Sequence, residues 1–294
     1  MKTIYLDNNA TTQVTPEVLS AMLPYFGNFY GNPSSMHSFG GQVAQKIRLA
    51  REQVAALLGA GPDEIIFTSC GTESDNAAIR SALATQPEKK HIIISRVEHP
   101  AIKSLCSYLA TQGYRITELP VDKSGLLDLE NLDKALTPDT AVVSLMWANN
   151  ETGVIFPVEE AAAMAQERGV LFHTDAVQAT GKIPVNLKNN KINMLSISGH
   201  KLHAPKGVGV LYIRRGTKFS PFLIGGHQER ERRGGTENVP SIIGLGKACE
   251  LAAQNMETEN EKVRILRDKL ENELLKKIPQ SRVNGDKINR LPNT

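Results

Sequence analysis

Val170-Leu171-Phe172-His173-Thr174-Asp175-Ala176-Val177-Gln178 joins a short apolar run, typical of a buried strand, to a group of polar residues. Three more runs rich in β-branched residues have the same character: 64–68, 91–95 and 141–146. Helical patterns lie between them, most clearly over residues 38–58, where apolar residues recur every three or four positions and Gly59 ends the helix. This alternation predicts an α/β fold whose mainly parallel, doubly wound sheet is covered on both faces.

The composition favours a small-molecule substrate. The 294 residues are 40% hydrophobic, and 34 Lys and Arg against 31 Asp and Glu give a net charge of only +3. This charge is too small to indicate binding to nucleic acid or to an anionic membrane. The three cysteines, Cys70, Cys106 and Cys249, have neither metal-ligand nor disulfide spacing, which favours a reducing compartment. Without a signal-like start or a membrane-length apolar run, we expect a cytoplasmic protein with no metal site.

Polar residues follow each strand-like run, where ligands of open α/β sheets bind. These segments are Cys70-Gly71-Thr72-Glu73-Ser74, Glu98-His99-Pro100, Asn149-Asn150-Glu151-Thr152-Gly153 and Asp175-Ala176-Val177-Gln178. The turn at Gly71 and Thr72 can offer backbone N–H groups and a hydroxyl to a phosphate. Each segment alone has a structural alternative, such as a helix cap. Their shared position predicts one binding site.

Ser198-Gly199-His200-Lys201 supplies what the other segments lack. A lysine forms a Schiff base with an aldehyde, an acid such as Asp175 keeps a pyridine nitrogen protonated, and hydroxyl and imidazole groups anchor a phosphate. Together these residue types predict pyridoxal 5'-phosphate as the cofactor, and therefore an enzyme that performs carbanion chemistry on an amino acid.

Eight motifs in this order resemble the cysteine desulfurases of the NifS/IscS type, in the class V aminotransferase branch of the fold-type I pyridoxal-phosphate enzymes. The motifs are Tyr5-Leu6-Asp7-Asn8-Asn9-Ala10-Thr11-Thr12, Gly31-Asn32-Pro33-Ser34-Ser35, Gly71-Thr72-Glu73-Ser74, Glu98-His99-Pro100, Asn149-Asn150-Glu151-Thr152-Gly153, His173-Thr174-Asp175-Ala176-Val177-Gln178, Ser198-Gly199-His200-Lys201 and Arg233-Gly234-Gly235-Thr236-Glu237-Asn238. The resemblance covers nearly the whole chain.

The resemblance and the change of pattern near residue 250 imply two domains. Residues 12–255 are expected to form the large cofactor-binding domain. Residues 1–11, as an N-terminal strand, and 256–294, with a charge-rich helix at Glu257 to Lys277, are expected to form a small α+β domain. In the resembled family, the nucleophilic cysteine and a carboxylate-binding arginine follow a stretch like Leu291-Pro292-Asn293-Thr294. We therefore expect part of the small domain to be missing from this sequence.

For the cofactor ring, the resemblance implies that Lys201 forms the Schiff base and moves protons between the substrate Cα and the cofactor. Asp175 is expected at the pyridinium nitrogen and Gln178 at the phenolic oxygen. His99 is expected to stack on the ring and is a second candidate for moving protons. The structural alternatives are helix N-capping for Asp175 and a cap or core imidazole for His99.

For the phosphate, the resemblance implies Gly71, Thr72, Ser198 and His200. Thr236 is expected to reach the cofactor phosphate of a partner subunit, so the resemblance implies a homodimer with shared sites. The charged run 229–233 next to Thr236 has an alternative interpretation as an exposed loop of mixed charge.

For the substrate, the resemblance implies L-cysteine. Asn150 is expected to contact its carboxylate and a cofactor oxygen, with Asn32 as a second candidate, although either could be a turn former. The implied reaction gives L-alanine and an enzyme persulfide, which passes sulfur to an acceptor or scaffold protein for iron–sulfur cluster assembly or another pathway. We expect none of the three cysteines to carry it: Cys70 is interpreted as a small buried residue, and Cys106 and Cys249 as helical residues.

Three alternatives remain at this point. A selenocysteine lyase would share most of the cofactor residues, and another class V lyase or aminotransferase would act on a different amino acid. A non-catalytic scaffold for sulfur acceptors would bind the cofactor and release no alanine.

Overall fold

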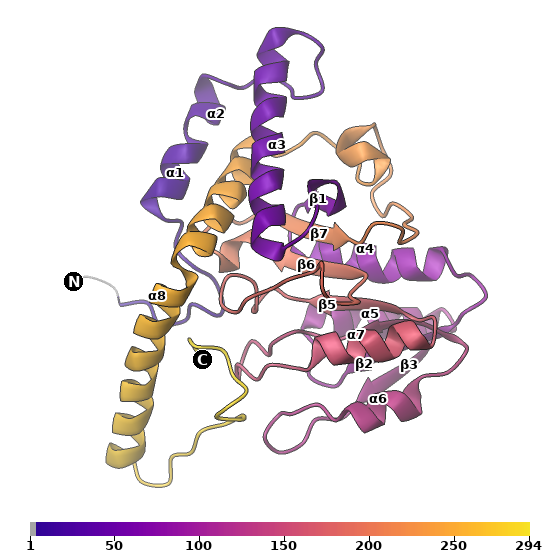
Figure 1. Ribbon diagram of the computed structural model, residues 1–294, viewed down its shortest axis with the longest axis vertical. Helices are drawn as coiled ribbons and strands as arrows, with labels where there is room; N and C mark the ends of the chain where they lie inside the picture. The colour runs from indigo at the N-terminus through magenta and orange to yellow at the C-terminus, as the bar shows by residue number, and fades with distance from the viewer. Residues whose placement is uncertain (1–3) are drawn as a thin grey trace.

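The computed structural model describes residues 4–294, and its centre is one seven-stranded sheet (Figure 1). The strands are β1 (Ile65–Thr68), β2 (His91–Ser95), β3 (Arg115–Leu119), β4 (Thr140–Ser144), β5 (Leu171–Asp175), β6 (Met194–Ser198) and β7 (Gly209–Ile213). Their order is β1-β7-β6-β5-β4-β2-β3, and only β7 runs antiparallel to its neighbours. The prediction of a mainly parallel sheet in an α/β fold is confirmed.

Helices cover both faces of this sheet. The helices are α1 (Pro16–Met22), α2 (Pro24–Gly27), α3 (Ser38–Leu58), α4 (Gly71–Ala84), α5 (Pro100–Thr111), α6 (Leu129–Ala135), α7 (Val158–Glu167) and α8 (Val239–Lys277), with short 3-10 turns η1 (Pro62–Glu64), η2 (Gly199–Lys201) and η3 (Gln228–Glu231). In β2, Ile92 and Ile94 face α4 and α5, whereas Ile93 faces the core shared by α3, α6, α7 and the first turns of α8. Successive strand residues point to opposite faces, so β2 packs against helices on both sides of the sheet. This explains why its central residues are continuously apolar.

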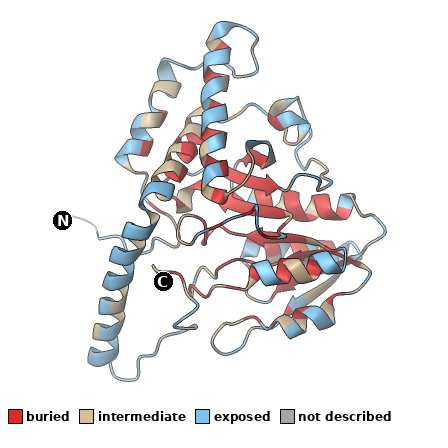
Figure 2. Cartoon of the chain, viewed as in Figure 1, coloured by how far each residue is buried: buried red, intermediate tan, exposed pale blue. Residues whose placement is uncertain are grey.

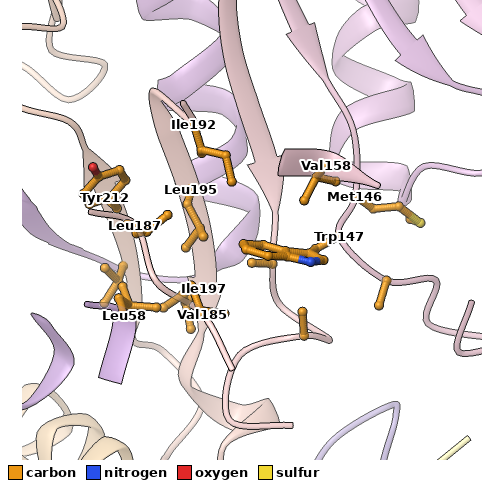
Figure 3. Packing of buried hydrophobic residues seen from close by; sticks show 14 of the residues in the cluster. Leu58, Met146, Trp147, Val158, Val185, Leu187, Ile192, Leu195, Ile197 and Tyr212 are labelled. Atoms are coloured by element: carbon orange, nitrogen blue, oxygen red, sulfur yellow. The ribbon is translucent and has the colours of Figure 1, made fainter. Parts of the chain in front are cut away.

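The larger core lies on the side of α3, α7 and α8. There Trp147 packs among side chains that include Leu195 of β6 and Val158 at the start of α7 (Figure 3). Burial is nearly complete along every strand except the edge strand β3, while the distal half of α8 is mostly exposed (Figure 2). The sheet and its two helical layers therefore form a rigid support for the residues at the strand ends.

Helix α3 agrees with the prediction for residues 38–58. The His37 imidazole accepts a hydrogen bond from the Gly40 N–H (3.1 Å), which satisfies one free donor of the first turn. Gly59 ends the helix in the left-handed conformation (φ 60°), which a glycine adopts without steric cost.

Two sequence-based expectations were wrong. Residues 4–14 form no strand; instead, the Thr12 N–H donates to the carbonyl of His200 (2.9 Å), so this segment crosses the strand ends. The long helix begins at Val239 and not near residue 257. Gly244 and Gly246 do not interrupt it, because their missing side chains leave room for Met22 of α1 and Ala50 of α3.

The division into a large and a small domain stays a prediction, although α8 crosses the expected boundary at residues 255 and 256 without a break. Residues 1–3 of the expected small domain lie outside the described part of the chain. Two strands not expected from the sequence, β3 and β7, complete the sheet. Within residues 4–294, every helix is too short or too polar to cross a membrane.

Candidate active site

A cavity of about 580 Å³ opens at the carboxyl ends of β4, β5 and β6. It brings together nine of the eleven site residues predicted from the sequence: Gly71, Thr72, His99, Asn150, Asp175, Gln178, Ser198, His200 and Lys201. Its volume is within the range of pockets that hold a small organic cofactor. The common edge of the parallel strands thus places residues from five separate segments around one space.

Lys201 enters this cavity from η2, the single turn that follows β6. Its Nζ donates hydrogen bonds to the carbonyl oxygens of Asn9 and Ala10. Burial lowers the pKa of Lys201, against the opposing charges of Asp175 and Asp7. A lysine whose neutral amine is favoured in this way is a better nucleophile and base than an exposed one.

Asp175 ends β5 and is nearly buried, with 8% of its surface exposed. Burial raises the pKa of this carboxyl group, while the Val177 N–H and the charges of His99 and Lys201 favour its ionised form. Its Oδ1 accepts a hydrogen bond from the Val177 N–H (2.9 Å), so the capping alternative describes a real contact. That contact uses one carboxylate oxygen and is compatible with a second contact inside the cavity.

The first turn of α4, with Gly71 and Thr72, forms another wall of the cavity. A Cβ atom on Gly71 would lie 3.1 Å from Val177 Cγ2 and 3.4 Å from Ser198 Cβ, so only glycine leaves this space open. The exposed N–H groups and the dipole of a 14-residue helix favour an anion at this end. The turn is therefore suited to a phosphate group.

The remaining predicted residues of the cavity are held by local contacts. His99 caps α5, since its Nδ1 accepts from the Ala101 N–H (3.1 Å), yet the side chain is exposed toward the cavity. His200 Nδ1 lies 3.1 Å from the Thr11 hydroxyl, and burial lowers the pKa of His200. Gln178 Nε2 donates to the carbonyl of Asn9 (2.9 Å).

Two predicted residues lie outside the cavity. The exposed Asn32 uses its side-chain oxygen to accept from the Ser34 N–H (2.9 Å), which is the turn-forming role held open as the alternative. Thr236 is also exposed and lies in the segment between β7 and α8, where it does not line this cavity.

Sequence reasoning assigned no role to two buried acids, Asp75 and Glu98, that interact electrostatically with Asp175. Asp75 lines the cavity from α4, and burial together with the charge of Asp175 raises its pKa well above the ordinary value. Burial raises the pKa of Glu98 to about 8. Asp75 Oδ1 and Glu98 Oε2 each lack a hydrogen-bond partner. An acid on the otherwise small and apolar face of α4, as at Asp75, was the available sequence signal.

Sequence reasoning also missed Asn9 as a residue of the site, although it lies in a quoted motif. Its carbonyl oxygen accepts from both Lys201 Nζ and Gln178 Nε2. Its side-chain amide donates to the carbonyl of Asn150 (3.1 Å) and to the Thr294 hydroxyl (2.9 Å). The segment around Asn9 thus forms a wall that links three predicted site residues.

The cysteines differ in their surroundings. Burial raises the pKa of both Cys106 and Cys249 to about 12, so neither thiol ionises readily. Cys70 is half-buried and not fully buried as expected, and its Sγ caps α4 by accepting from the Glu73 N–H (3.4 Å).

These residues fit pyridoxal 5'-phosphate. A lysine amine, a buried carboxylate in no salt bridge within residues 4–294 and a glycine-lined helix N-terminus match an aldehyde, a ring nitrogen and a phosphate. Gly71 leaves the space that a side chain would fill. Within residues 4–294, no group of three or more His, Cys, Asp or Glu side chains is arranged to hold a metal ion.

Comparison with known proteins agrees with this geometry. Residues 4–294 match the model of the aminotransferase class-V family. The cysteine desulfurase NifS of Azotobacter vinelandii is 62% identical over 295 residues, which cover all of this chain and 73% of that protein. A solved NifS-like protein superimposes with a TM-score of 0.95 at 40% identity, covering 99% of this chain and 80% of that one.

A second solved structure, SspA in complex with cysteine, has a TM-score of 0.83 at 38% identity and covers 89% of this chain and 77% of its own. Since the first likeness covers 99% of this chain, it includes the sheet and nearly all of the residues that surround the cavity. The chain therefore belongs to the aminotransferase class-V family, among the pyridoxal-phosphate-dependent cysteine desulfurases of the NifS type.

Proposed function

We propose that this protein removes sulfur from L-cysteine and releases L-alanine, with pyridoxal 5'-phosphate bound in the cavity at the strand ends. The observation that carries the proposal is that Lys201, Asp175 and the first turn of α4 face one cavity of suitable size. The relative solved with cysteine supports the choice of substrate.

Lys201 would hold the cofactor through its amine, and Asp175 would keep the ring nitrogen protonated. When bound, the cofactor supplies an electron sink for the negative charge that forms at the substrate Cα. Because burial lowers the pKa of Lys201, the neutral form of its amine is favoured, and this form would accept a proton at Nζ. Asp175 would stay ionised beside the bound ring, since the positive charge there offsets the effect of burial.

The other cavity residues would position these groups. Gly71, Thr72, Ser198 and His200 would hold the phosphate, and Gln178 would reach the phenolic oxygen. His99 would lie against the cofactor ring. Because its Nδ1 caps α5, the helix fixes the orientation of the imidazole. Asn150, held through its carbonyl by the Asn9 amide, would contact the substrate carboxylate.

We further propose that the protein acts as a homodimer in which Thr236 reaches the partner's cofactor phosphate, and that it passes sulfur to an acceptor protein. Thr236 is exposed and outside the cavity of its own subunit, which suits a role in a second one. Exposed aromatic side chains on α2 and the loop after it, Phe26 (65%) and Tyr30 (74%), indicate a surface that is covered in an assembly.

None of the three cysteines is proposed as the persulfide carrier. A carrier must be accessible and readily ionised, whereas Cys106 and Cys249 are buried with raised pKa values. The Cys70 thiol is engaged as the cap of α4. Sulfur removal by residues 4–294 would then require a thiol other than these three, such as an added reductant or a cysteine outside these residues.

The test measures alanine released from L-cysteine by the protein loaded with pyridoxal 5'-phosphate, with and without dithiothreitol. We expect the loaded protein to be yellow and to release alanine in the presence of dithiothreitol. Lys201→Ala should release at least a hundredfold less alanine than the unmodified protein. The matched control is Lys188→Ala, an exposed lysine outside the cavity. Equal release without added thiol would contradict the cysteine assignment. A colourless protein, or full activity in Lys201→Ala, would contradict the proposed function.

A further inference from the structure

The loop at 223–238, which carries Thr236, is held in an unusual backbone conformation. Glu229, Arg230 and Glu231 are consecutive left-handed residues with φ angles of 48°, 59° and 65°. Residues other than glycine rarely adopt this backbone conformation, and it persists only where the surrounding structure imposes it. The base of the loop is closed by a hydrogen bond from the Gly234 N–H to the carbonyl of Leu223 (2.9 Å).

The first restraint is a buried ion pair. Arg51 of α3 donates to both carboxylate oxygens of Glu229 (2.7 and 2.6 Å), and both residues are buried. Glu229 also accepts from the Phe67 N–H (3.0 Å), while Arg51 and Arg230 each donate to the carbonyl of Ile65 (2.7 Å). Because β1 is an edge strand, these charged groups satisfy the backbone atoms that face away from β7.

The second restraint joins the loop to the cofactor site. Arg233 donates to the carboxylate of Glu73 through Nε (2.9 Å) and through its second guanidinium nitrogen (3.2 Å). Glu73 lies in the first turn of α4, next to Gly71 and Thr72, and also accepts from the Ser69 N–H (2.8 Å). Thr236 is three residues beyond Arg233, so this bidentate contact anchors the loop close to Thr236.

We propose that the Arg51–Glu229 and Glu73–Arg233 pairs are positioning residues that hold this loop so that Thr236 is presented to the cofactor phosphate of the partner subunit. The inference rests on the homodimer of the proposed function. It assigns a role to the charged run 229–233, for which an exposed loop of mixed charge was an alternative interpretation from the sequence. The two ion pairs fix the shape of the loop before a partner subunit binds. The loop therefore loses little conformational entropy when the dimer forms and the partner's site is completed.

The test measures the release rate of pyridoxal 5'-phosphate, followed by absorbance after transfer into excess apo-acceptor. The loop variant is Arg51→Met with Glu229→Gln, which leaves no unpaired buried charge and keeps an acceptor for the Phe67 N–H. Thr236→Val removes the hydroxyl alone. Arg232→Met is the matched control, since Arg232 lies in the same loop and outside both ion pairs.

We expect Thr236→Val to release cofactor about tenfold faster, as for the loss of one charge-assisted hydrogen bond. The loop variant should be faster by a similar factor, and combining it with Thr236→Val should add nothing, whereas Arg232→Met should match the unmodified protein. Effects that multiply would mean that the ion pairs act independently of Thr236, which would overturn the inference. If the loop variant does not fold, Arg233→Gln makes the same test on the second pair.

Mixed dimers separate this inference from the proposed function. One subunit carries Lys201→Ala, so that covalently held cofactor resides only in the other. Faster release is expected when the loop variant and the intact site are on different subunits. Faster release only when both are on the same subunit would contradict the shared sites of the proposed function. Unchanged release from either arrangement, with Thr236→Val still effective across the dimer, would overturn the inference alone.

Discussion

Glu98 should make the protein less stable as the pH rises from 5.5 to 7.5. Its side chain is 4% exposed, and burial raises the pKa from its ordinary value of 4.5 to about 8. Between these two values the folded protein keeps a proton that the unfolded chain loses. The free energy of unfolding therefore falls as the pH rises, by about 1.4 kcal/mol per pH unit for this one group.

Glu98→Gln tests this expectation because glutamine resembles the protonated acid. Oε1 accepts from the Ser95 hydroxyl (2.5 Å) and the Met146 N–H (3.0 Å), and a glutamine oxygen can accept both. Over two pH units the stability of the unmodified protein should fall by about 2.7 kcal/mol more than that of the variant. The measurement is urea unfolding at pH 5.5, 6.5 and 7.5, with the exposed Glu88→Gln as control.

Parallel stability curves for the unmodified protein and Glu98→Gln would refute this reasoning, since they would mean that Glu98 titrates equally in the folded and unfolded chains. Burial raises the pKa of Asp75 and Asp175 in the same direction. Burial lowers the pKa of His91 to about 4 and that of His173 to about 3, which raises the stability of both proteins as the pH rises, so the prediction concerns only the difference between them.

Three other substitutions test the site and the core. Gly71→Ala should speed cofactor release about tenfold, because the added Cβ meets atoms at 3.1 and 3.4 Å. Gly41→Ala, with open space around its Cβ, should instead stabilise the fold by up to about 1 kcal/mol in urea unfolding. Asp175→Asn should retain cofactor by absorbance yet lower alanine release about a hundredfold, and near-normal release would contradict its placement. Phe172→Ala should cost about 3–5 kcal/mol in the same unfolding assay, whereas Leu266→Ala, 66% exposed on α8, should cost under about 0.5 kcal/mol.

The sequence predicted the elements whose patterns are locally complete. Helix α3 carries its apolar period and a terminating Gly59, and β2 has three consecutive isoleucines at its centre, so both were found with their limits. β3 was missed because Arg115 and Glu118 are exposed at the sheet edge and leave little apolar signal. The N-terminal strand was wrong because the segment around Thr12 makes its backbone hydrogen bond to His200, a contact between positions 188 residues apart.

For the site, residue type carried most of the information. Lys201 and Asp175 have chemistry that few other functions require, and each follows a strand that is recognisable by itself. Asn9 could not be found in this way, because its part depends on a backbone carbonyl, which every residue has. The positions of Asn32 and Thr236 depend on loop paths, and neither lines the cavity of this chain.

The wall formed around Asn9 has a consequence for biosynthesis. Its contact with Lys201 joins positions 192 residues apart, so this contact has a very high sequence separation. The first dozen residues leave the ribosome long before η2 exists and must remain undocked while the sheet forms. A complete cavity therefore arises late, and a nascent chain that has made β1 to β5 should not yet capture the cofactor.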